Sequence, residues 1–210
     1  MARGATLALV LGAATFGCGP VKHHVKLSMV PEAARVEVEP MKTKVESARD
    51  VYDEAKTTVK HSRGLLKEAE TELKSERGQL KIAEEAVDME QAREKAGEPA
   101  EVAAAKTRAR NVKQLVKMAR ARVDVEASRR KHLDQLEAEM KAAWVLAIAR
   151  YEVAKAAKVD SADPKWAEKK AKVEAQLEAK TEAYEREKAR SSKTGGRLQK
   201  AEDKLVDAQG

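Results

Sequence analysis

The reactive side chains are few in this chain of 210 residues, and they are widely spaced. Cys18 is the single cysteine, so its thiol has no internal disulfide partner and is available for modification. The four histidines are His23, His24, His61 and His132, and no nearby cysteine or carboxylate completes a metal site at His23 and His24. Carboxylates are abundant, but no nucleophile–base arrangement or Gly-rich phosphate loop accompanies them. We therefore expect no catalytic residue, no bound metal and no cofactor.

Cys18 closes an N-terminal segment that has the layout of an export signal. Arg3 supplies a positive start, residues 5–16 are uncharged and mostly apolar, and the small residue Gly17 precedes the cysteine. An apolar run of this length is too short for a transmembrane helix, which needs about 20 residues. The sequence thus predicts a signal peptide over residues 1–17 and no permanent membrane span.

The segment Thr15-Phe16-Gly17-Cys18 resembles the lipobox of bacterial lipoproteins. Gly17 and Cys18 match its pattern, whereas that family favours Leu at position 15 and Ala or Ser at position 16. The resemblance implies cleavage before Cys18, a lipid on its thiol and an acyl chain, such as palmitate, on its amine. Gly19, which is not aspartate, implies the outer membrane, with the protein facing the periplasm. An ordinary signal peptide cut nearby is the alternative.

Residues 18–40 differ from the rest of the chain in their high proline content. Pro20, Pro31 and Pro40 interrupt this segment, and its acidic and basic residues balance. We expect a flexible tether here, able to extend about 70 Å from a lipidated Cys18.

The composition of the remainder indicates long helices. Apolar residues make up 42% of the chain, charged residues 37% and aromatic residues only 3%, which is typical of a coiled coil and unlike a mixed globular enzyme or a disordered chain. Pro99 and Pro164 divide this part. Gly97 suits the end of a helix just before Pro99, and Asp163 is a good N-cap before Pro164. We predict helices over residues 41–96, 100–158 and 165–192, and a short helix over 197–207 after Gly195 and Gly196.

A heptad pattern in the helix over residues 41–96 is the strongest signal in the chain. Large residues recur every seven positions, and a mostly small residue follows each after three positions: Val45, Tyr52, Val59, Leu66, Leu73, Leu80 and Val87, then Ala48, Ala55, Ser62, Ala69, Glu76, Ala83 and Glu90. We therefore predict an all-α fold, a long antiparallel helical hairpin with a third returning helix.

This hairpin register makes specific pairs. It sets Tyr52 beside Trp144 and Val45 near Tyr151, and the second turn sets Met140 near Tyr184. It also brings His61 toward His132, although both flank the seam and should be solvated.

A basic run occupies residues 105–122, which contain seven basic residues and no acidic one. Five of them share a helical face at spacings of three and four: Lys106, Arg110, Lys113, Lys117 and Arg120. The register places residues 74–91 opposite this run, where five acidic residues would partly neutralise it: Glu76, Glu84, Glu85, Asp88 and Glu90. The alternative is contact with an anionic lipid or an envelope polymer. We expect no nucleic acid, because no aromatic residue interleaves the run to stack bases.

Three aromatic residues lie toward one end of the predicted hairpin: Trp144, Tyr151 and Trp166. They suit core packing, or a docking spot for a partner.

These features favour a structural or adaptor lipoprotein of the bacterial envelope that acts as a helical spacer and interaction rod. Its partners would be the membrane through the lipid, an envelope protein or the cell wall, and a second copy of itself in a homo-oligomer. One alternative is a module that binds an envelope polymer or anionic lipid through the basic face. Another is a helical-hairpin component of an export or efflux assembly. We do not expect an enzyme.

Overall fold

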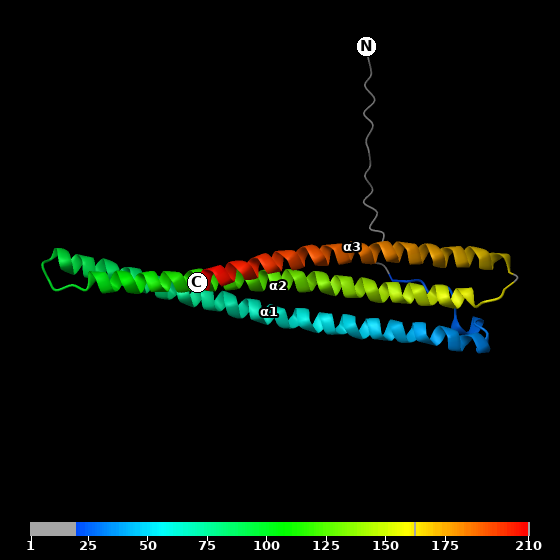
Figure 1. The fold of residues 1–210 in the computed structure, drawn as a ribbon. Helices are drawn as coiled ribbons and strands as arrows, with labels where there is room; N and C mark the ends of the chain where they lie inside the picture. The colour runs from blue at the N-terminus through cyan, green and yellow to red at the C-terminus, as the bar shows by residue number, and fades with distance from the viewer. Residues whose placement is uncertain (1–19, 162, 210) are drawn as a thin grey trace, which may run out of the picture.

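The protein is a long antiparallel rod of three helices (Figure 1). The computed structural model describes residues 20–161 and 163–209. A short 3₁₀ helix, η1 (Leu27–Met29), precedes α1 (Glu32–Lys95), α2 (Val102–Ala157) and α3 (Pro164–Gln209). The 64 residues of α1 span about 96 Å. The described residues include no strand, so the predicted all-α hairpin with a returning helix is confirmed. None of the described helices is apolar over a length sufficient to cross a bilayer.

The two turns use the residues that the sequence marks. Gly97 adopts a φ of 79°, and its N–H bonds the carbonyl of Glu94 at 3.1 Å while the N–H of Glu98 bonds the carbonyl of Arg93 at 3.0 Å. These bonds form a Schellman motif that ends α1. At the second turn, Asp163 accepts a bond from the N–H of Lys165 at 3.0 Å and caps α3, which begins at Pro164.

The heptad seam of α1 faces α2 as predicted. All fourteen heptad positions are buried or half-buried, and Val59, Ser62 and Ala69 are at most 3% exposed. Tyr52 stacks on Trp144 with ring centroids 5.8 Å apart and an interplanar angle of 11°, which confirms the predicted register. Gly64 and Gly78 point away from the seam, and a Cβ at either position would meet no other atom within 4 Å.

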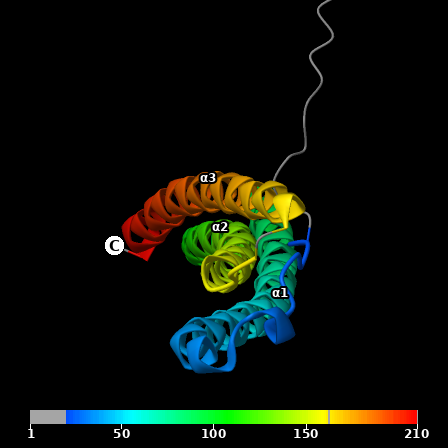
Figure 2. The same ribbon diagram turned by 90° about the vertical axis from the view of Figure 1, so that its right-hand side faces the viewer.

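The middle helix packs on both sides. In Figure 2, α2 lies between α1 and α3, and α3 crosses over α2 along the rod. In the sequence of α2 the apolar residues are interrupted by charged ones at Glu126, Arg130 and Glu137, and the position of the helix between two others accounts for this. Between residues 125 and 149 of α2 only Lys131 and Lys141 are exposed, because α1 and α3 cover the helix from two sides. This part of α2 therefore has no continuous polar face toward solvent.

The predicted tether over residues 18–40 is wrong in its described part. Helix α1 begins at Glu32, nine residues before the predicted start, and Pro40 lies inside it. A proline inside a helix costs about 3 kcal/mol, but this turn has compensating contacts. Val38 is 1% exposed, and an ion pair joins Glu37 to Lys158 of α2.

The predicted break at Gly195 and Gly196 is also wrong, because α3 continues through both residues to Gln209. Gly195 lies against the ring of His132, where a Cβ would come within 3.3 Å of Cε1. The neighbouring hydroxyl of Thr194 is 3.2 Å from Nδ1 of His132. This glycine therefore allows close helix approach. The contact also settles the position of His132, which turns to α3 and leaves His61 exposed on α1.

The adjacent glycines provide a matched test of this packing. We expect Gly196→Ala to raise the free energy of unfolding by up to about 1 kcal/mol, because alanine favours the helix and the site is open. Gly195→Ala should gain less or destabilise, because its methyl group meets His132. Urea unfolding of both variants measures the difference, and equal gains would contradict the proposed close approach.

Candidate functional site: a docked N-terminal segment and a basic groove

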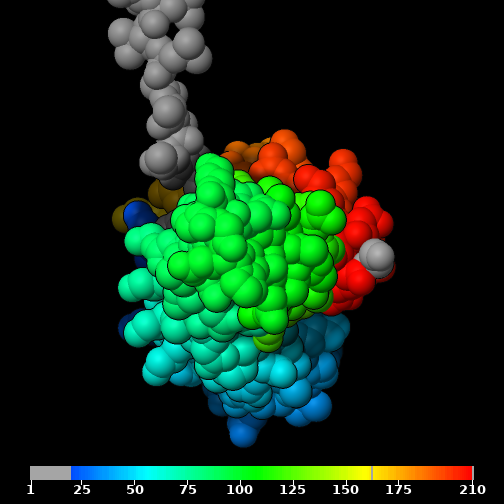
Figure 3. Space-filling view, turned by 90° about the vertical axis from the view of Figure 1, so that its left-hand side faces the viewer, coloured from blue at the N-terminus to red at the C-terminus, as the bar shows by residue number. Residues whose placement is uncertain are grey.

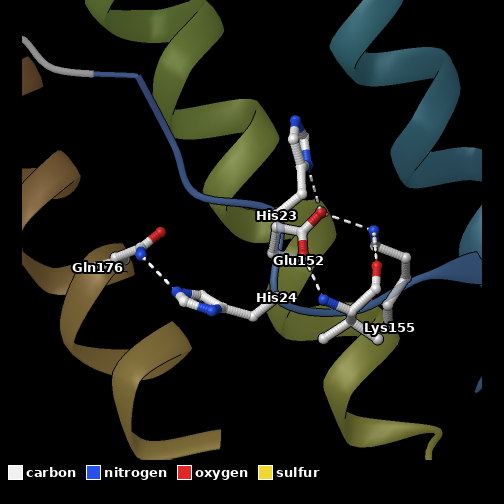
Figure 4. Close-up of polar contacts among 6 residues, drawn as sticks. His23, His24, Glu152, Lys155 and Gln176 are labelled. Atoms are coloured by element: carbon white, nitrogen blue, oxygen red, sulfur yellow. Dashed lines mark hydrogen bonds and ion pairs between the residues drawn. The ribbon is translucent and has the colours of Figure 1, made fainter. Parts of the chain in front are cut away.

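The segment before α1 is packed against the end of the rod. Val21, Val25 and Val30 are 8%, 2% and 1% exposed. Val25 belongs to an apolar cluster with Ala156 of α2 and with Trp166 and Val173 of α3. The N-terminal segment, residues 20–31, therefore lies across α2 and α3 near the turn that joins them (Figures 1 and 4).

Two charged residues of α2 hold the backbone of this segment. The N–H of Val25 donates to Oε2 of Glu152 at 3.3 Å, and Nζ of Lys155 donates to the carbonyl of Val25 at 2.6 Å. Lys155 also donates to Oε1 of Glu152 at 2.6 Å. The two side chains are 1% and 6% exposed, so a buried ion pair satisfies both backbone groups of Val25.

Glu152 is kept ionised by these contacts. Burial alone would raise the pKa of its carboxyl, but the hydrogen bonds from Lys155, His23 and the N–H of Val25 outweigh burial and lower that pKa. His23 places Nδ1 2.8 Å from Oε1 of Glu152 while its own side chain stays 67% exposed. The docked state therefore needs a charged Glu152.

The adjacent histidines of the segment point to different helices (Figure 4). His23 contacts Glu152 of α2, whereas His24 places Nε2 2.9 Å from Nε2 of Gln176 on α3. The two histidines therefore attach the docked segment to α2 and α3, one to each helix. The described residues contain no group of three or more His, Cys, Asp or Glu side chains placed to hold a metal ion.

The three candidate docking aromatics are engaged inside the protein. Trp144 stacks on Tyr52, and its buried Nε1 has no hydrogen-bond partner in the described part of the chain. Trp166 is 8% exposed in the cluster around Val25. Lys155 lies 4.7 Å from the ring centroid of Tyr151, and burial raises the pKa of that phenol. All three thus contact other residues of this chain, with Trp166 buried and Trp144 and Tyr151 half-buried.

The basic face predicted on α2 is exposed. Its five residues, Lys106, Arg110, Lys113, Lys117 and Arg120, form no hydrogen bond or ion pair with any described residue. The expected neutralisation by residues 74–91 of α1 does not occur at these positions. Glu85 pairs with Lys81, and Glu90 with Arg93, both within α1. Among the described residues, the run's only ion pairs are those of Arg108 with Glu101 and of Arg122 with Glu72.

The returning helix covers only part of the basic face. Nε2 of Gln114 donates to the carbonyl of Ala208 at 2.9 Å, so α3 ends beside the middle of the run. Seen along the rod, the turn between α1 and α2 stands in front of the end of α3 (Figure 3). Lys117 and Arg120 consequently share a groove with α3, whereas Lys106, Arg110 and Lys113 lie toward the two-helix tip.

The sequence singled out Cys18, which lies outside the described residues, and missed Glu152 and Lys155. Both sit within the apolar stretch of α2, three residues apart, where charges are unexpected on a buried helix. Two charged residues in an apolar stretch could have indicated a buried ion pair at this place in α2. Comparison with known protein families, curated proteins and solved structures gave no match to this chain.

Neutralising Glu152 should release the N-terminal segment. Glu152→Gln leaves the buried Lys155 without its counter-ion, so we expect a loss of about 3 kcal/mol or more in unfolding free energy and faster exchange of the Val25 amide. The control is Glu37→Gln, which removes a partly exposed pair with Lys158 and should cost less than about 1 kcal/mol. Denaturant unfolding and hydrogen exchange measure both. Equally small losses of stability in both variants would refute the role of the buried Glu152–Lys155 pair in holding the segment.

Docking should also depend on pH in a defined direction. Because the pKa of Glu152 is lowered in the folded protein, its contribution is present above the unfolded value of 4.5 and is lost as the pH falls through the folded value. We expect protection of the Val25 amide to persist near neutral pH and to decline below 4.5. The dependence should vanish in Glu152→Gln. A wild-type amide equally protected throughout this acid range would contradict the assignment.

Proposed function

We propose that this protein is a membrane-anchored structural or adaptor lipoprotein of the bacterial envelope. A lipid on Cys18 holds it at a membrane, and the helical rod acts as a spacer and interaction surface in the periplasm. The role is mechanical and non-enzymatic. Its support from the sequence is the export-signal layout that ends at the single cysteine.

The observation that carries the proposal is the docking of the N-terminal segment beside the proposed lipid site. Pro20 is the first described residue, and Val21 and Val25 are already packed on the rod. Only one residue, Gly19, separates Cys18 from Pro20, and two peptide units span at most about 7 Å. A lipid on Cys18 would therefore be joined almost directly to a rigid body.

Docking changes the proposed mechanics of the spacer. The expected tether would have let the rod range about 70 Å from the membrane. With residues 20–31 packed on α2 and α3, the reach comes instead from the helices, whose longest spans about 96 Å. A rigid connection transmits position and force, which suits an adaptor that must hold partners at a fixed separation. The outer membrane is the proposed location.

Lipidation tests the proposal directly. We expect a fatty-acid probe supplied to growing cells to label the wild-type chain and to leave Cys18→Ser unlabelled, since the chain has no other cysteine. The wild type should fractionate with the outer membrane and Cys18→Ser with soluble periplasmic protein. Glu152→Gln is the control, because it disturbs docking but leaves Cys18 intact and should remain labelled. An unlabelled, soluble wild-type protein would refute the anchor.

A further inference from the structure

The groove that receives the N-terminal segment continues along the rod. Glu152 and Gln176 contact this segment from α2 and α3. Residues seven apart on a supercoiled helix share a face, so the same face continues on α2 at Val145, Ala138, Lys131, Asp124 and Lys117, and on α3 at Ala183, Arg190, Arg197 and Lys204. These residues line two further hollows between α2 and α3.

The far part of this groove is strongly basic. It has a volume of about 570 Å³, and six cationic side chains line it, three from each helix: Lys117, Arg120 and Lys131 of α2, and Arg197, Lys200 and Lys204 of α3. Asp124 is the one acidic residue in the lining. We call this hollow the basic groove. All six cations are exposed, and none has a hydrogen bond or ion pair with a described residue.

Ordinary surface charge does not explain this grouping well, because nearby arginines of the same helices are paired. Arg122 lies 2.7 Å from Glu72, and Arg129 lies 2.6 Å from Glu126. Arg129 also reaches Glu202 of α3 at 3.4 Å. These acidic partners come from all three helices, and none of them lines the basic groove, where like charges from α2 and α3 converge. Their mutual repulsion would be relieved by a bound polyanion.

We propose that the basic groove binds a linear polymer with phosphate groups in its backbone. From Lys117 to Lys131 the groove extends about 21 Å, so six cations supply about one positive charge per 3.5 Å. Such density suits a strand with a charge in every repeat unit. Small residues, including Ala121, Ser128 and Ala201, form part of the lining and leave room for the strand between the cations. Lysine and arginine both bind phosphate oxygens through charge-assisted hydrogen bonds.

Two other anionic partners fit the groove less well. A membrane surface is flat and would be favoured by apolar side chains for insertion, but none of the large exposed apolar side chains of the described chain lines the groove. A single-stranded nucleic acid would be favoured by aromatic stacking, and no aromatic residue lines it. The inference rests on the proposed interaction role of the rod, but it does not depend on the lipid at Cys18.

The test measures binding of lipid-free poly(glycerol phosphate) to the full chain carrying Cys18→Ser, over a series of salt concentrations. The groove variant combines Arg197→Gln, Lys200→Gln and Lys204→Gln. The matched control combines Lys169→Gln, Lys170→Gln and Lys172→Gln, which removes three exposed charges from the same helix outside the groove. Circular dichroism checks that both stay helical.

We expect the groove variant to lose at least about tenfold in affinity, and its slope of log affinity against log salt to fall by about 2, since each lost contact contributes about 0.7. The control should bind like the unsubstituted chain. The proposal is overturned if both variants lose affinity equally, or if the unsubstituted chain does not bind. Equal affinity for poly-glutamate would overturn the phosphate assignment. Tighter binding to vesicles of phosphatidylcholine and phosphatidylglycerol would replace the polymer by a membrane surface. Because no variant carries the lipid, failure here is separate from failure of lipidation.

Discussion

The architecture depends on one constraint, that α2 packs on two sides at once. A helix of a simple hairpin buries one stripe, whereas α2 meets α1 along one side and α3 along the other. Burial on both sides gives Glu126, Glu152 and Lys155 environments in which charges must find partners. Lys155 and Glu152 find each other and the backbone of Val25. The backbone of the N-terminal segment therefore supplies hydrogen bonds that the buried charges of α2 need.

The same constraint shapes the surface. Because α1 and α3 flank α2 without closing around it, the three helices form an open layer (Figure 2). Side chains of α2 and α3 line hollows between these two helices. One groove, between α2 and α3, holds the N-terminal segment at one end and six exposed cations farther along. The proposed anchor and the proposed polymer site are thus connected through one rigid pair of helices, a suitable arrangement for a protein that joins a membrane to another component of the envelope.

Local patterns predicted much of the fold. The heptads of α1 set the seam and the pairing of Tyr52 with Trp144, because both follow from periodicity and turn position. Gly97 and Asp163 marked the turns, since each residue type satisfies backbone groups at a helix end. The turns depend only on residues close in sequence, and the seam depends only on the register of α1 against α2.

The features that the sequence did not predict arise from distant contacts. His23 and Glu152 are 129 positions apart, and nothing near Pro20 or Pro31 indicates that the segment packs on α2. Gly195 was interpreted as a helix end because its packing against His132 is invisible locally. The basic groove was half predicted. The basic face predicted on α2 included Lys117 and Arg120. The other cations of the groove, Arg197, Lys200 and Lys204, lie on α3 and reach the same hollow only because the second turn folds α3 back along α2.

The N-terminal segment is fixed to the rod by its contacts with α2 and α3. Spin labels at Lys22 and at Glu178 of α3, both exposed, would measure the distance between the segment and the rod in the full chain with Cys18→Ser. The docked segment predicts one narrow distribution of short distances between the labels at neutral pH. A broad distribution extending to tens of ångströms would show a free tether and contradict the docked arrangement.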